Sequence, residues 1–185
     1  SITNGINNVA IGHNAQQNAT SQRYNVALSF TALQQNTGER NTAIGHEALA
    51  FTGNNPVYSP TENVAIDARS LWNVTGYLNT VVGYNAGSNI TSGNTNIVIG
   101  HNAQVPSAIA SNQISIDNLI YASLGNVGIG VTVPTVKLEV NGKIRAVDVN
   151  FSGLPVYANE AAAIAGGIAT GDLYQTLTGE IRIKV

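Results

Sequence analysis

The stretch NTAIGHEA, residues 41–48, decides the fold of this chain because the same pattern returns along it. Each copy begins with Asn, has an aliphatic residue three positions later and a small residue seven positions later. Successive copies start 17, 16, 22, 16 and 17 residues apart. A nearly fixed period indicates one small structural unit stacked many times. The copies begin at Asn8, Asn25, Asn41, Asn63, Asn79 and Asn96.

The residues that follow each Asn alternate in a way that is typical of a β-strand. The first is β-branched, the second is Ala or Val, and the third is aliphatic, as in Thr42, Ala43 and Ile44. A strand that is apolar on both faces is buried on both faces. We infer that the branched face fills the interior of each coil. The small face then lets another backbone approach closely.

Between the copies lie stretches rich in Asn, Thr, Ser, Gly and Gln, which are turn residues. One strand, a turn, a short return and a second turn fit in about 16 residues, so the coil is thin and buries little. Such a rod is best stabilised by copies of itself. The long 22-residue interval contains an insertion with two prolines, residues 53–60, which we expect to emerge at the surface.

The phrases NNVAIGHNA, NTAIGHEAL and NIVIGHNA resemble the repeats of trimeric autotransporter adhesin heads and the related repeats of bacteriophage and other viral tail-fibre proteins. The resemblance covers roughly residues 1–110. It implies a left-handed parallel β-roll in each chain and a homotrimer around a common axis.

The rest of the chain changes character. GNVGIGVTVPTVKLEVNG resembles a connector of tail fibres, and Asn141-Gly142 is a strong hairpin signal. Asn159 can cap a short helix over 160–165 that Gly166-Gly167 ends, and a hairpin around Thr178-Gly179 follows. The end of the chain resembles a small C-terminal module of phage and large-virus structural proteins.

These patterns predict an all-β fold: a homotrimeric parallel β-roll or β-helix rod, then a β connector and a small trimeric α+β tip. The chain is expected to divide into three segments: a repeat shaft or head over 1–124, a β-hairpin connector over 125–150, and a tip module over 151–185. The first segment ends in a degenerate seventh coil at 112–124. The tip is too small to hold a core alone, so we expect three copies to meet there.

Composition excludes several classes of protein. Charged residues make up only 10%, the formal net charge is −2, and no basic cluster exists, so nucleic acid is not an expected partner. Cysteine is absent, which excludes disulfides and thiol-based zinc sites. No apolar run is long enough to span a bilayer. The chain begins with Ser rather than Met, so we expect a processed product or a fragment, with an upstream fibre or virion protein as a partner.

Three sets of side chains are candidate sites. His13, His46 and His101 share one repeat position, where they either hold a metal or anion on a trimer axis or serve as flat side chains at a strand end. Because Phe30, Ala68 and Tyr84 occupy the same position in other copies, the second interpretation is favoured, and we expect neither a metal nor a cofactor.

The acids Glu39, Glu47, Glu62 and Asp67 lie near the insertion, and paired acids cleave glycans in glycosidases. Solvated loop residues are the simpler interpretation. Aromatic and polar residues are candidate receptor contacts, either in the loops or at the tip. They are Tyr58, Trp72 and Tyr77 in the loops and Tyr157, Asn159, Tyr174 and Gln175 at the tip.

The function expected from the resemblance is a non-enzymatic structural and receptor-binding part of a viral or phage tail fibre or spike. It would be extracellular on the virion and bind a host cell-surface glycan or protein. Two alternatives stay open: the head of a bacterial trimeric surface adhesin, which normally continues into a coiled-coil stalk, and a polysaccharide depolymerase spike. Residues 111–185 show no heptads, which ranks the adhesin second.

Overall fold

The computed structural model describes residues 5–17, 21–35, 37–51, 59–147, 150 and 152–184. The chain divides into two compact units, Ser1–Lys143 and Ile144–Val185. None of the helical structure in the described residues has the length and apolarity that crossing a bilayer requires.

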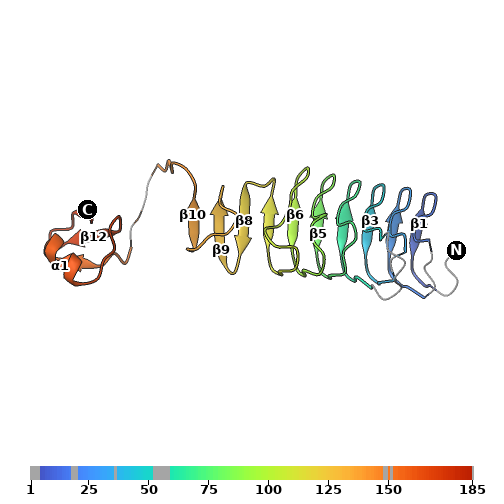
Figure 1. Cartoon of the computed structure of the whole chain (residues 1–185), viewed down its shortest axis with the longest axis horizontal. Helices are drawn as coiled ribbons and strands as arrows, with labels where there is room; N and C mark the ends of the chain where they lie inside the picture. Colours follow the sequence, from blue (N-terminus) through green and yellow to red (C-terminus); the bar gives the residue numbers. More distant parts are fainter. Residues whose placement is uncertain are drawn as a thin grey trace. The chain divides into compact units, whose positions relative to one another are not determined.

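The first unit is a parallel β-solenoid (Figure 1). Its described strands form one ten-stranded sheet in sequence order, β1 to β10, with each of β1–β6 parallel to the next. The all-β class and the stacked coils expected from the repeat are therefore confirmed. The strands are β1 (Val9–Ile11), β2 (Val26–Leu28), β3 (Thr42–Ile44), β4 (Val64–Ile66), β5 (Thr80–Val82), β6 (Ile97–Ile99), β7 (Ile114–Ile116), β8 (Ile120–Ser123), β9 (Asn126–Ile129) and β10 (Leu138–Val140).

Register along the sheet places equivalent repeat positions directly above one another. Ala27 is the partner of Ala43, and Ala43 is the partner of Ala65. These central residues are fully buried. They belong to one hydrophobic core cluster with the leucines that follow each turn, Leu33, Leu49 and Leu71.

The predicted assignment of the two strand faces is wrong. The small residue at the centre of each of β2–β7 fills the coil, and the residues on either side of it point away from the core. Ala43 is 0% exposed, whereas Ile44 beside it is 36% exposed. The physical reason is the thinness of the coil. The leucine of the return already occupies the interior, and only a small strand residue fits opposite it.

Strand centre and return position compensate one another in volume. Where the strand centre is Ala43 or Ala65, the residue six positions later is Leu, whereas Ala10 is followed by Gln16. Where it is Val81, that residue is Gly87, and a Cβ there would lie 3.2 Å from a methyl of Val81. The interiors of the Ala43, Ala65 and Val81 coils therefore hold a nearly constant volume, as a packed core requires.

Buried asparagines bind the coils together along the sheet. The side-chain oxygen of Asn41 accepts the backbone N–H of Asn63 at 3.0 Å, and the Asn63 oxygen accepts that of Asn79 at 2.9 Å. Each side-chain amide also donates to a turn carbonyl, such as Asn63 to Gly76 at 3.0 Å. The ladder runs from Asn8 to Gln113, and its members beyond Asn8 are at most 1% exposed. The repeated Asn thus satisfies backbone groups by forming a ladder.

The solenoid does not complete a further coil after β7. The strands β7, β8 and β9 are antiparallel neighbours, and β10 then pairs in parallel with β9. The hairpin lies at Leu124-Gly125, between β8 and β9. The hairpin predicted at Asn141-Gly142 is not formed, because residues 143–147 contain no strand to pair with β10.

The second unit is a three-stranded sheet with one short helix. The helix α1 (Glu160–Ala165) begins after Asn159, whose side chain accepts the N–H of Ala162, as the sequence predicts. A hairpin follows around Thr178-Gly179, which is also confirmed. The strands are β11 (Val156–Tyr157), β12 (Leu173–Thr176) and β13 (Ile181–Ile183), with β11 parallel to β12.

Candidate functional site

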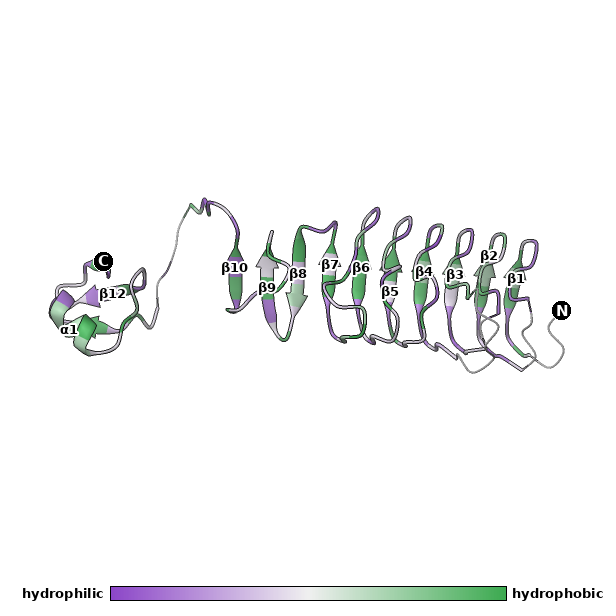
Figure 2. Ribbon diagram, in the orientation of Figure 1, coloured by the Kyte–Doolittle hydropathy of each residue, from purple (hydrophilic) through white to green (hydrophobic). Residues whose placement is uncertain are grey.

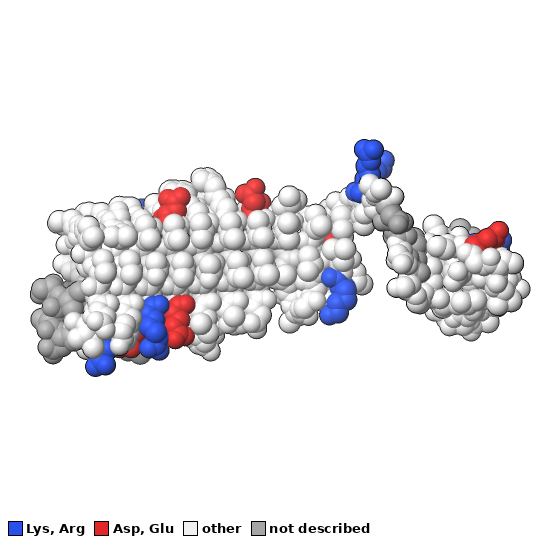
Figure 3. Space-filling model, turned by 180° about the vertical axis from the view of Figure 1, so that it is seen from behind, with Lys and Arg blue, Asp and Glu red and all other residues white. Residues whose placement is uncertain are grey.

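The outward-pointing residues of β1–β10 form a continuous apolar surface, here called the outer face. Hydropathy colouring shows green along the strands of the sheet (Figure 2). On the side that Figure 3 draws, charged side chains of the first unit lie along its long edges, with an uncharged band between them. The outer face consists of Val9, Ile11, Val26, Leu28, Thr42, Ile44, Val64, Ile66, Thr80, Val82, Ile97, Ile99, Ile114, Ile116, Ile120, Ala122, Val127, Ile129, Leu138 and Val140.

Many of these aliphatic side chains are well exposed on the single chain. Ile11 is 62% exposed, Ile99 is 41% exposed and Leu138 is 57% exposed. Ten strands at about 4.8 Å spacing give the outer face a length of roughly 40 Å. A contiguous apolar surface of this length, without a charge, is typical of a surface that another molecule covers.

The histidine position forms a ladder of flat rings, here called the ring ladder. The ring of Phe30 stacks between those of His13 and His46, with centroids 5.3 Å apart on each side and interplanar angles of 7° and 9°. Tyr84 and His101 stack at 5.3 Å and 16°. Within one chain the three histidines are therefore separated by other rungs. In the described residues, no three His, Asp or Glu side chains gather closely enough to hold a metal ion.

The turn that carries the ring ladder requires an unusual backbone. Gly45 has φ +131°, and a Cβ there would lie 2.6 Å from the backbone carbon of Asp67 in the next coil. Asp67 itself has φ +93°, and its carboxylate accepts the N–H of Ala68 at 2.7 Å. The close approach of successive turns holds the rings in register.

The candidate acids take part in contacts with cations or the backbone. Glu62 accepts a hydrogen bond from Arg40 at 2.8 Å, and Glu39 lies 3.9 Å from the same guanidinium. Glu47 accepts from Nε of Arg69 at 2.6 Å, which raises the pKa of Arg69 above its ordinary value. These pairs link neighbouring coils on the surface and contribute little stability, because they are exposed.

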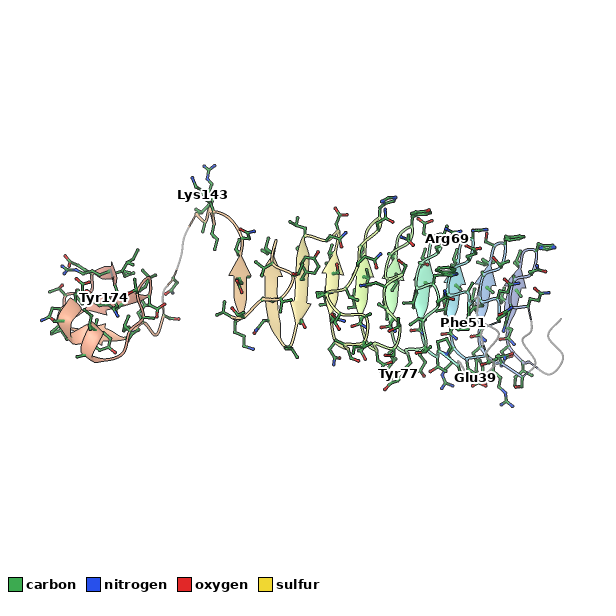
Figure 4. All side chains as sticks on the ribbon, in the orientation of Figure 1. Glu39, Phe51, Arg69, Tyr77, Lys143 and Tyr174 are labelled. Carbon is green, nitrogen blue, oxygen red and sulfur yellow. The ribbon has the colours of Figure 1, made fainter. Side chains whose placement is uncertain are left out.

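The loop aromatics differ in exposure. Tyr77 is 49% exposed, and Trp72 is half-buried with the guanidinium of Arg69 5.9 Å from its ring centroid. Tyr58 and most of the insertion lie outside the described residues. Figure 4 places Tyr77 and Phe51 along one edge of the first unit and Arg69 along the opposite edge. The ring-ladder turn and the Tyr77 loop are therefore separate surfaces.

The tip candidates fall into two groups. Tyr174 is 1% exposed and packs edge-on against Tyr157 at 6.3 Å, so it is a core residue of the second unit and not an available contact. Tyr157 is half-buried. Asn159 is exposed but caps α1, and Gln175 is half-buried with its amide 3.4 Å from the carbonyl of Gly179. The sequence does not distinguish the buried tyrosine from the exposed one, because polar and apolar residues alternate only weakly in this segment.

Comparison with known proteins found no match: no family model fits the chain, and no curated protein or solved structure matches it.

Proposed function

We propose that the chain is a structural and receptor-binding part of a viral or bacteriophage tail fibre or spike, assembled as a homotrimer. The observation that carries the proposal is the outer face. An uncharged aliphatic surface about 40 Å long cannot stay in water without association, and a periodic surface is matched best by another copy with the same period. Three copies related by an axis along the sheet would bury three such faces together.

The second unit supports the same assembly. One face of its sheet carries Leu173, Ile181 and Ile183. Val156 of the neighbouring strand β11 lies on the same face, because it pairs with Gln175. Ile181 and Ile183 are about half exposed, at 49% and 57%. The opposite face packs Tyr174 in the core. A unit of this size gains a sufficient core when copies of the exposed sheet face meet, as a distal trimeric tip would allow.

A bacterial adhesin head is the second candidate, since the same repeat and outer face serve both. The choice depends on which cells the trimer binds. We expect light scattering to return three times 19.2 kDa at micromolar concentration. A folded monomer would contradict the assembly. Fluorescently labelled trimer should adsorb to bacterial cells if the chain belongs to a phage fibre. Adsorption to animal cells alone would favour a surface adhesin or a fibre of an animal virus.

A further inference from the structure

The ring ladder is interrupted at one rung. Rings stack over His13, Phe30 and His46, and again over Tyr84 and His101. The intervening coil carries Ala68 at this position. His46 and Tyr84 are therefore two coils, roughly 10 Å, apart, and the repeat position between them carries only the methyl group of Ala68. We call this interval the Ala68 gap.

The Ala68 gap has the dimensions of one flat ring. Successive rungs of the ladder are 5.3 Å apart. A ring placed over Ala68 would thus lie at this same spacing from both His46 and Tyr84. The two walls are accessible, since the His46 side chain is 47% exposed and Tyr84 is 43% exposed.

Polar groups surround the gap. Glu47 lies beside it, with a carboxylate oxygen 3.8 Å from Nδ1 of His46 and 2.6 Å from Nε of Arg69. The Asp67 carboxylate is held at the turn by the N–H of Ala68. Carboxylate and guanidinium groups next to two ring faces are suited to a ligand with a flat apolar side and hydroxyl groups at its rim.

We propose that the Ala68 gap binds one pyranose ring of a host cell-surface glycan, stacked between His46 and Tyr84 with its hydroxyls on Glu47 and Arg69. An aromatic side chain of a protein would also fit between the walls. The charged rim favours the sugar, because several hydroxyls of one pyranose ring can bond to Glu47 and Arg69, whereas a protein aromatic ring offers at most one such group. The inference rests on the proposed attachment function and names its ligand class.

The test is saturation-transfer difference NMR with the full chain and three probes: methyl β-galactopyranoside, methyl β-glucopyranoside and methyl α-mannopyranoside. We expect transfer to the ring protons of at least one probe. The variant Ala68→Tyr fills the gap with the missing rung and should abolish the transfer while the chain stays folded by circular dichroism. Tyr84→Leu, which removes one wall, should weaken it. Tyr77→Ala alters an aromatic residue on the opposite edge and should leave it unchanged.

The outcomes separate this proposal from the proposed function. Absence of transfer to all three probes, or transfer that persists in Ala68→Tyr, would overturn the sugar site. Binding of p-cresol in place of the sugars, lost in Ala68→Tyr, would also overturn it and assign the gap to a protein aromatic. If wild-type trimers adsorb to cells in either case, the attachment function stands. Its contact surface lies elsewhere if no probe binds, and its receptor is a protein if p-cresol binds. A chain that binds a pyranoside but no cell contradicts the attachment function alone.

Discussion

Gln16 is the most evident defect in the interior of the solenoid. It is 1% exposed, and in the described part of the chain neither of its side-chain polar atoms has a hydrogen-bond partner. Leu33, Leu49 and Leu71 occupy the same position in the next three coils. They have φ values of 49° to 54°, close to the 49° of Gln16. The backbone of this coil is therefore already suited to leucine.

We expect Gln16→Leu to stabilise the protein by about 1–3 kcal/mol, because it removes two unsatisfied buried groups and extends the leucine stack. Thermal unfolding at a fixed chain concentration checks this. The reciprocal variant Leu33→Gln should lower the melting temperature. A lower melting temperature for Gln16→Leu would show that Gln16 has a partner, such as an ordered water, that leucine displaces.

At this scale the sequence showed the turns through their Asn, Thr, Ser, Gly and Gln residues, but it did not show the backbone conformation of other residue types in them. The structure places Tyr24, Arg40 and Leu78 in the left-handed region, each directly before a ladder residue. Their side chains give no local signal for it. The hydrogen bonds between coils impose the conformation, and they outweigh the roughly 1–2 kcal/mol that it costs each residue.

At the scale of the strand, alternation showed two apolar faces but not which of them is inside. Both faces are suited to burial, one in the coil and one against a further molecule. Which face is inside depends on the distance between the strand and the returning segment of the same coil. That distance is set by Leu49 and its equivalents, which lie outside the strand. The pairing of Ala43 with Leu49 and of Val81 with Gly87, six residues apart, was present in the sequence and indicates which face is inside.

Ala43→Leu tests the assignment of faces. The added branch enters a filled interior, so we expect destabilisation of about 1–3 kcal/mol by overpacking. Denaturant unfolding measures it, and Leu49→Ala in the same chain should recover part of the loss, giving a coupling energy in the double-mutant cycle. Ile44→Val, on the outer face, is the control and should change the free energy of unfolding less. If the changes in the free energy of unfolding were additive in the double mutant, Ala43 and Leu49 would not share one interior volume.

At the scale of the whole molecule, the proposed trimer rests on the outer face. Ile99 is 41% exposed on the single chain and lies in the middle of the apolar surface. We expect Ile99→Lys to reduce the mass measured by light scattering from three chains to one, because a trimer would bury three unpaired charges. Tyr77→Lys places the same charge on an edge loop and should remain trimeric. Equal masses for both variants would exclude the outer face as the interface.

The order of the elements could be read from the sequence over most of the chain, because period and turn chemistry are local. The end of the solenoid could not. The reversal at β8 depends on whether the chain at Asp117 to Leu119 turns back or continues into another return, and both courses suit its turn residues. The sequence likewise showed that the rings of the ladder share one repeat position. Only the register of the folded coils shows that unlike rings stack on one another.

The asparagine ladder also has a mechanical consequence. Its bonds and those of the parallel strands run from coil to coil, along the direction in which the sheet grows. A pull between the first strand and the last would therefore load these bonds along their own direction and one coil at a time, rather than shearing many together. Each released coil would free about 16 residues, up to roughly 50 Å of chain. A solenoid built this way would lengthen by one coil at a time when it is pulled along its axis, and so would dissipate mechanical work while most of its coils stay folded.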